Sequence, residues 1–214
     1  MRKVQIRNTE LAVSRFIFGT AGLFNVGGAR ARQKLLFAAV DAGFSHFDTA
    51  PYYGFGVAER DLGQVLKARP EVTVTTKVGL YSPGGEGQPA ASVFLRKAAG
   101  RVLPSLSRPS VDFSLARAQR ALDDSLRRLQ RETIDLHEPV AALVQTDEWA
   151  AWSERLLAQG KIRGFGLALT ADRLAPFLQA GSPLAGVVQV HDSLEAREAD
   201  ILARHGRALQ ITYG

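Results

Sequence analysis

Three polar side chains stand near the ends of two apolar runs, and their types suit proton transfer. The run FSHFDTA (44–50) carries Asp48, Tyr53 follows on the adjoining segment, and the run VTVTTKV (72–78) carries Lys77. A tyrosine hydroxyl has an unperturbed pKa near ~10, and a neighbouring ammonium group lowers that pKa by favouring the phenolate. We therefore expect Tyr53 to be the acid, Lys77 to tune its pKa and Asp48 to hold Lys77.

Strand alternation decides whether these groups converge. Side chains alternate between the two faces of a strand, so Asp48 faces away from Phe47, and Lys77 shares a face with Thr75. If both polar faces line one interior, Asp48 and Lys77 meet at the C-terminal ends of neighbouring strands and satisfy each other's charge. The alternative is purely structural: Asp48 would cap a turn, Lys77 would extend to solvent, and Tyr53 would be a surface aromatic.

Short apolar runs and amphipathic segments alternate along almost the whole chain. This order predicts a parallel sheet covered by helices. The segment 4–14 ahead of the first strand has hairpin character, and 79–113, rich in Pro and Gly, is predicted to be a long loop. We expect strands at 15–20, 44–50, 72–78, 133–137, 164–169, 186–192 and 209–213, and helices at 29–43, 58–68, 115–129, 147–160, 171–181 and 195–206.

Repeated strand-helix units either close into a (β/α)8 TIM-type barrel or stay open as a doubly wound sheet. A phosphate-binding Gly-x-Gly-x-x-Gly loop after the first strand would favour the open sheet, but the chain reads AGLFNVGG there. The barrel is therefore preferred, as one domain over residues 1–214. In such barrels the chemistry lies on loops that follow the C-terminal ends of the strands.

Composition restricts the classes of partner. The net charge is +6, and the Lys and Arg residues are spread along the chain, which favours attraction of small anionic ligands over a nucleic-acid surface. The absence of Cys excludes disulfides and thiolate metal sites. No run approaches the ~18 apolar residues of a membrane span, and no signal peptide is evident. We expect a soluble cytoplasmic protein with no metal, nucleic-acid or membrane partner.

The stretch FDTAPYYGFGVAERDLGQVL (47–66), followed by TVTTKVG (73–79), resembles the aldo-keto reductases, and the similarity continues through 13–21, 123–139, 160–169 and 186–190. Its pattern is nearest to the bacterial aldose and pyridoxal dehydrogenases. The resemblance implies a (β/α)8 barrel that binds NADP or NAD and transfers hydride to or from the carbonyl of an aldose or small aldehyde. It implies a catalytic tetrad of Asp48, Tyr53, Lys77 and His137.

His137 departs from the family pattern. The family has about three more apolar residues between the Asp and the His of this strand than IDLHEP (134–139) provides. If the strand is anchored at His137, residues 131–133 must stretch to reach the preceding helix. If it is anchored at Ile134, His137 does not reach the rim, because a shift in register moves each side chain along the strand and between its faces.

The resemblance also implies cofactor contacts. Gln189 matches a family glutamine that binds the nicotinamide carboxamide, and Tyr213 matches the tyrosine that stacks on the nicotinamide ring. Ala168 and Leu169 stand where the family has a Ser-Asn pair, so their side chains cannot make those hydrogen bonds.

The chain ends at Gly214, one residue after Tyr213, and the resemblance implies that the final strand-helix units of the barrel are missing. About seven parallel strands cannot close with the usual strand number and shear, so we expect an incomplete barrel whose open edges allow self-association. Two functions stay open: an active reductase or dehydrogenase, or a catalytically impaired remnant or non-enzymatic binding module of the same fold.

Overall fold

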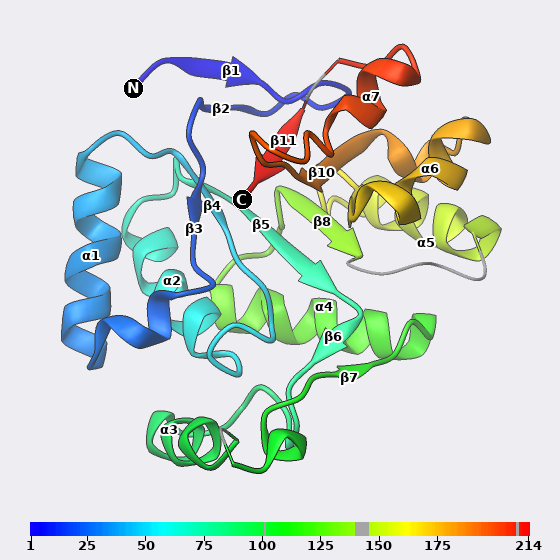
Figure 1. Cartoon of the computed structure of the whole chain (residues 1–214). Coiled ribbons are helices and arrows are strands. Elements are labelled where there is room, and N and C mark those ends of the chain that lie inside the picture. The colour runs from blue at the N-terminus through cyan, green and yellow to red at the C-terminus, as the bar shows by residue number, and fades with distance from the viewer. Residues whose placement is uncertain (101, 140–145, 209) are drawn as a thin grey trace.

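Two parallel sheets form the body of the protein, and helices cover them (Figure 1). The computed structural model describes residues 1–100, 102–139, 146–208 and 210–214. The first sheet has the order β3 (Phe18–Gly19), β4 (His46–Asp48), β5 (Thr73–Val78) and β8 (Leu136–Pro139). The second has the order β11 (Ile211–Tyr213), β10 (Val187–His191) and β9 (Gly166–Leu169).

Helices follow most of these strands in sequence, as the alternation predicts. They are α1 (Ala29–Asp41), α2 (Val57–Ala68), α4 (Leu115–Leu129), α5 (Thr146–Ala158), α6 (Ala171–Gln179) and α7 (Asp200–Arg204), with short 3-10 turns η1 (Leu23–Val26) and η3 (Pro183–Ala185). A parallel bridge between Ile134 and Ile162 connects the segments that lead into β8 and β9, and so joins the two sheets. Among the described residues no pairing joins β3 to β11, so the sheets do not close into a barrel.

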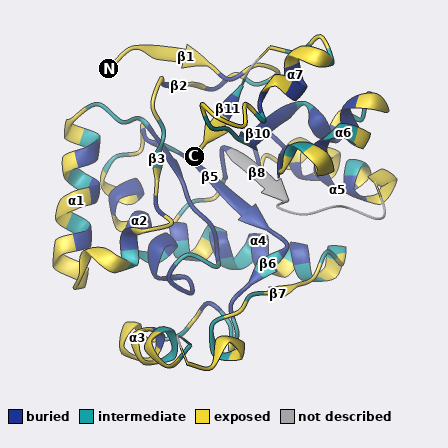
Figure 2. Ribbon diagram, in the orientation of Figure 1, coloured by how far each residue is buried: buried dark blue, intermediate teal, exposed yellow. Residues whose placement is uncertain are grey.

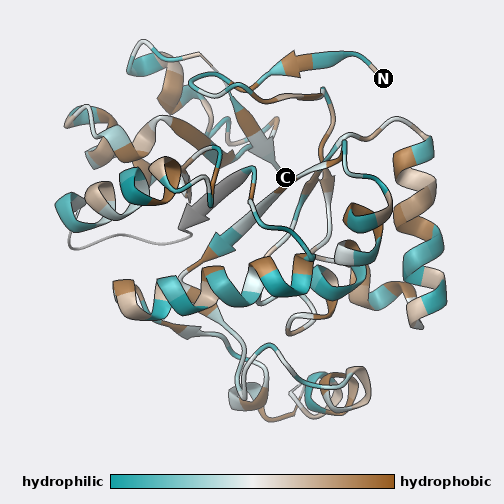
Figure 3. Ribbon diagram, turned by 180° about the vertical axis from the view of Figure 1, so that it is seen from behind, coloured by the Kyte–Doolittle hydropathy of each residue, from teal (hydrophilic) through white to brown (hydrophobic). Residues whose placement is uncertain are grey.

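Helix α4 shows how the sequence specifies these elements. Its buried positions recur at helical spacing, and they are Ala118, Ala121, Leu122, Ser125 and Leu129, which gives the helix one apolar stripe toward the sheet. Figure 3 shows the resulting alternation of hydrophilic and hydrophobic bands along α4. On α2, a Cβ at Gly63 would lie 2.3 Å from the carbonyl oxygen of Arg128, so only glycine permits this close approach to α4.

The strands that carry the predicted site are buried on both faces, as expected of parallel strands covered by helices. All three residues of β4 are buried, and in β5 all but Thr73 are (Figure 2). Both ring nitrogens of His46 are hydrogen-bonded, to Thr73 Oγ1 at 2.7 Å and to Thr75 Oγ1 at 2.8 Å. His46 is therefore a structural residue, buried below the site with both ring nitrogens hydrogen-bonded.

The prediction of a long loop over residues 79–113 is wrong. Strands β6 (Leu80–Tyr81) and β7 (Ser110–Val111) pair antiparallel and enclose α3 (Ala90–Ala99) and the 3-10 turn η2 (Pro104–Leu106). Pro89 and Gly100 flank α3 as its caps instead of interrupting it. Much of this excursion is exposed (Figure 2), while Val93 anchors it against Phe55 and Val57.

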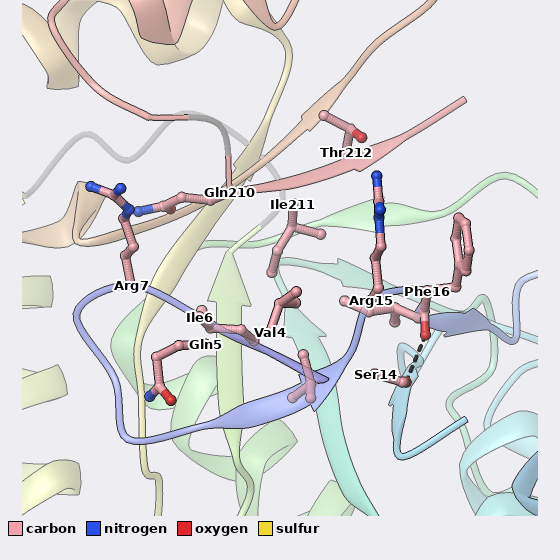
Figure 4. Close-up of a pocket in the computed structure, with 12 residues that line it drawn as sticks. Val4, Gln5, Ile6, Arg7, Ser14, Arg15, Phe16, Gln210, Ile211 and Thr212 are labelled. Carbon is pink, nitrogen blue, oxygen red and sulfur yellow. Dashed lines mark hydrogen bonds between the residues drawn. The ribbon is translucent and has the colours of Figure 1, made fainter. Parts of the chain in front are cut away.

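The N-terminal strands β1 (Lys3–Gln5) and β2 (Ala12–Ser14) pair antiparallel. Their turn buries Ile6 and Leu11 against Val187 and Ile211 of the second sheet. A cavity of about 520 Å³ lies between this hairpin, residues 15–17 and residues 210–212 (Figure 4). It marks the side on which β11 has no strand partner among the described residues. Self-association there stays a prediction.

Within the described residues, no helix is both long enough and apolar enough to cross a lipid bilayer.

Candidate active site

Strand pairing brings Asp48 and Lys77 together. In the parallel register Asp48 lies opposite Thr75, and Lys77, two residues further along β5, therefore shares the face of Thr75 beyond the end of β4. The Lys77 ammonium donates to both carboxylate oxygens of Asp48 and, at 3.2 Å, to the carbonyl oxygen of Thr49. Both residues are buried, at 8% and 7% exposure. The predicted ion pair is confirmed.

A third group completes this pair from the other sheet. Gln189, on β10, donates from Nε2 to Asp48 Oδ2 at 3.2 Å. The carboxylate of Asp48 thus has several donors, which compensates the cost of burying its charge. Removing Asp48 or Lys77 would leave the other buried charge unpaired, which costs about 3–5 kcal/mol in proteins.

Tyr53 lies on the tight turn between β4 and α2. Its N–H donates to Ala50 O at 3.0 Å, and Gly54 and Gly56 adopt left-handed conformations with φ of 59° and 82°. These turn residues bring the Tyr53 ring close to Lys77, whose Nζ lies 5.4 Å from the ring centroid. Tyr53 is therefore next to the buried ion pair, as predicted.

The direction of the Tyr53 pKa differs from the expectation. Burial raises the pKa of Tyr53 above its ordinary value, the Lys77 ammonium opposes this with a smaller effect, and the Asp48 carboxylate adds to it. Lys77 acts in the predicted sense, but the prediction of a lowered pKa is wrong because desolvation disfavours the phenolate more strongly. The hydroxyl is accordingly protonated at neutral pH, as a proton donor must be.

The neighbouring tyrosine is bound elsewhere. The Tyr52 hydroxyl donates to the carbonyl oxygen of Ser107 at 2.7 Å, and its ring packs on Phe55 with centroids 5.7 Å apart. Tyr52 therefore links the turn to the segment between β5 and α4, whereas Tyr53 lies beside Lys77.

A cavity of about 370 Å³ opens over these groups. It brings together five of the six predicted site residues, Asp48, Tyr53, Lys77, Gln189 and Tyr213. Its remaining lining residues are Gly19, Ala21, Leu80, Ala168, Thr170 and Arg173. Among the described residues, no group of three or more acidic or His side chains is arranged to hold a metal ion.

Two cavity residues have features that suit a ligand. Gln189 is buried, and its Oε1 has no hydrogen-bond partner among the described residues, so a bound N–H or O–H group could donate to it. Tyr213 is 45% exposed, and its ring edge packs on His191 with the centroids 5.5 Å apart. One amide acceptor and one partly open aromatic ring therefore border the same space.

The backbone places His137 at a different level from Lys77. In the pairing of β5 with β8, His137 lies opposite Thr76, and Glu138 lies opposite Lys77. Ile134, at the start of this segment, donates its N–H to Lys161 O at 3.0 Å. The side chain of His137 lies outside the described part of the structure, so its catalytic role stays a prediction.

Sequence reasoning missed Arg173 and the contact between Gln189 and Asp48. Arg173 lies in the first turn of α6, directly after β9. A cation that follows the end of a predicted strand is the sequence feature that could have pointed to it. Gln189 and Asp48 are 141 positions apart, and no local pattern connects them.

Comparisons with known proteins show which family this chain resembles. The family model described as "Aldo/keto reductase family" matches residues 15–207. Pyridoxal 4-dehydrogenase of Microbacterium luteolum is 30% identical over 98% of this chain and 69% of its own length. The 6-dehydroglucose reductase of Novosphingobium aromaticivorans is 33% identical over 80% of this chain and 53% of its own length.

Solved structures show the same fold. The holo form of an aldo-keto reductase from Bacillus halodurans superposes with a TM-score of 0.74 at 24% identity, covering 97% of this chain and 64% of that one. Glycerol dehydrogenase of Gluconobacter oxydans gives a TM-score of 0.73 at 26% identity, with 99% and 63% covered. The chain thus spans a little under two thirds of these two structures. The family match over most of the chain shows that this protein belongs to the aldo/keto reductase family.

Proposed function

We propose that this chain carries the site of an NAD(P)-dependent oxidoreductase that transfers hydride between nicotinamide and the carbonyl of an aldose or small aldehyde. The observation that carries the proposal is the buried Asp48–Lys77 pair beside Tyr53 in one cavity. The names of the relatives, which include a pyridoxal dehydrogenase and a dehydroglucose reductase, support a carbonyl substrate.

Tyr53 is the proton donor and acceptor in this proposal. In the reductive direction its hydroxyl donates to the carbonyl oxygen, and in the oxidative direction the phenolate takes the proton back. The Lys77 ammonium stabilises the phenolate as its charge develops. Asp48 keeps Lys77 in place by accepting its hydrogen bonds.

The cavity fits the nicotinamide end of a dinucleotide. The unpartnered Gln189 Oε1 suits the N–H of a carboxamide, and Tyr213 lines the same space. When bound, the nicotinamide supplies the carbon that gives or accepts the hydride. Ala168 lines the cavity without a polar side chain, so the side-chain contacts to the carboxamide are fewer than the family pattern provides. The choice between NAD and NADP stays open.

The alternative is a catalytically impaired family member or a binding module. Two observations favour it: the apolar Ala168 and Leu169, and the register that sets His137 opposite Thr76 instead of Lys77. Under this alternative the cavity would bind a ligand without turnover.

Nucleotide titration tests cofactor binding, and a turnover assay separates the two functions. We expect NADH or NADPH fluorescence to change saturably on binding, and Tyr53→Phe to lower turnover by about 10²–10⁴-fold, the contribution of a positioned acid, at nearly constant nucleotide affinity. Tyr52→Phe is the matched control, because the Tyr52 hydroxyl bonds to Ser107 and not to the site. The oxidoreductase proposal fails if nucleotide does not bind saturably at millimolar concentration. The assignment of Tyr53 fails if Tyr53→Phe keeps the wild-type rate.

A further inference from the structure

Arg173 is a cation on the wall of the cavity that contains Tyr53 and Lys77. Some arginines of this protein pair with carboxylates, as Arg32 does with Asp61 and Arg128 with Glu59. Among the described residues, no carboxylate lies within ion-pair distance of the Arg173 guanidinium. The side chain therefore brings a positive charge to the cavity that has no ion-pair partner among the described residues.

Two candidate acids, Asp172 and Asp48, already have other hydrogen-bond partners. Asp172, the sequence neighbour, hydrogen-bonds the Thr170 side chain and the backbone N–H of Arg173, and these bonds, with a smaller contribution from the Arg173 charge, hold the pKa of Asp172 below its ordinary value. Asp48, inside the cavity, accepts from Lys77 and Gln189. Since Asp48 and Lys77 compensate each other, the charged groups that line the cavity sum to one positive charge, that of Arg173.

The positions of these groups suggest how a ligand would lie. Arg173 and Thr170 reach the cavity from the segment that follows β9 in the second sheet, whereas Tyr53 and Leu80 reach it from segments after β4 and β5 in the first. The reacting carbonyl must lie within hydrogen-bond reach of Tyr53. A second polar group on the same small molecule can then meet Arg173 within this cavity of about 370 Å³.

We propose that Arg173 binds the carboxylate of the substrate and that the site selects carbonyl compounds bearing an acid group over their neutral counterparts. A guanidinium presents paired N–H donors that match a carboxylate bidentately, which adds orientation to charge. A carboxylate held by Arg173 and a carbonyl held near Tyr53 would fix both ends of one molecule. The assignment of the carbonyl end rests on the proposed function, whereas the carboxylate contact does not.

The test compares D-glucuronate with D-glucose, which differ at C6 by a carboxylate in place of a hydroxymethyl group. Calorimetric titration without nucleotide should show the wild-type chain binding D-glucuronate at least about tenfold more tightly, the lower range for a hydrogen bond to a charged group. The preference for D-glucuronate should weaken as the salt concentration is raised, because the Arg173 side chain is exposed and its charge is screened. Arg173→Gln should bind the two sugars equally.

Arg30→Gln is the matched control. Arg30 is exposed on α1 and does not line the cavity, so this variant loses the same charge and should keep the preference for D-glucuronate. Arg173→Lys, which keeps the charge without the paired donors, should keep part of it. Far-UV circular dichroism of each variant shows whether the fold is intact.

Several results would overturn the assignment of Arg173. They are failure of the wild type to bind either sugar, equal binding of both, or a preference that survives in Arg173→Gln. An NADPH titration covers the other source of anionic oxygens: if Arg173→Gln weakens NADPH binding and leaves D-glucuronate binding unchanged, Arg173 serves the nucleotide phosphates and the proposal is wrong. Selective D-glucuronate binding without saturable nucleotide binding would support the Arg173 contact and refute only the oxidoreductase function.

Discussion

Replacing Arg128 should destabilise this protein far more than replacing its neighbour Arg127. Glu59, on α2, is fully buried at 0% exposure, and its carboxylate accepts from Thr76 Oγ1 at 2.6 Å and from Arg128 Nε at 2.6 Å. Arg128→Met removes the compensating charge and leaves the carboxylate buried. Arg127, next along α4, pairs with Asp124 and is 76% exposed, so Arg127→Met removes an arginine from the same helix at the surface.

The buried and the exposed ion pair differ in how much free energy of unfolding their loss is expected to cost. Removing one partner of a buried ion pair costs about 3–5 kcal/mol, whereas an exposed pair contributes about 0–1 kcal/mol. In a chain of this length one kcal/mol shifts the melting temperature by roughly 2–4 °C. We therefore expect Arg128→Met to melt roughly 6–20 °C below the wild type, and Arg127→Met at most about 4 °C below it.

Thermal melts measure the shifts in melting temperature, and urea unfolding measures the differences in the free energy of unfolding. Far-UV circular dichroism and fluorescence of the buried Trp149 and Trp152 follow the transition. The double variant Glu59→Gln/Arg128→Met should recover part of the loss, because a neutral amide costs less to bury than an unpaired carboxylate. Equal destabilisation by the two single variants, or no recovery in the double variant, would refute the attribution of the cost to a buried charge.

Two further predictions concern the turn and the interior. Gly56 and Gly85 have φ of 82° and 83°, but a Cβ at Gly56 would lie 2.1 Å from the carbonyl oxygen of Glu86 and one at Gly85 would meet nothing within 4 Å. Gly85→Ala should cost only the left-handed backbone strain of about 1–2 kcal/mol. Gly56→Ala should lower the free energy of unfolding in urea by at least about 2 kcal/mol more, because its Cβ would also clash with Glu86. Similar losses in the two variants would contradict the close approach. His46 has its pKa lowered from 6.5 to about 3, first by burial and then by Lys77. The unfolded chain therefore binds the proton more readily than the folded one, so the stability present above pH 6.5 falls as the pH drops toward 3. The melting temperature should fall less steeply between pH 7 and 4 in His46→Asn than in the wild type. An unchanged slope would refute the role of His46 in this pH dependence.

The sequence determined the features that depend on local periodicity. The apolar spacing of residues 115–129 predicts α4 at the bounds it has in the structure, because burial along a helix repeats with its 3.6-residue turn. Alternation along two strands likewise places Asp48 and Lys77 on one face, and the structure pairs them. The alternation of strands and helices was also sufficient to predict a parallel sheet.

Tertiary structure alone decided how these groups behave. The excursion between β5 and α4 holds a helix, since its Pro and Gly residues cap α3, a distinction that composition does not make. The pKa of Tyr53 follows burial more than its charged neighbour, and burial is set by every segment packed around the ring. The contact of Gln189 with Asp48 and the place of Arg173 on the cavity wall join segments distant in sequence, and local patterns carry no information about such distances.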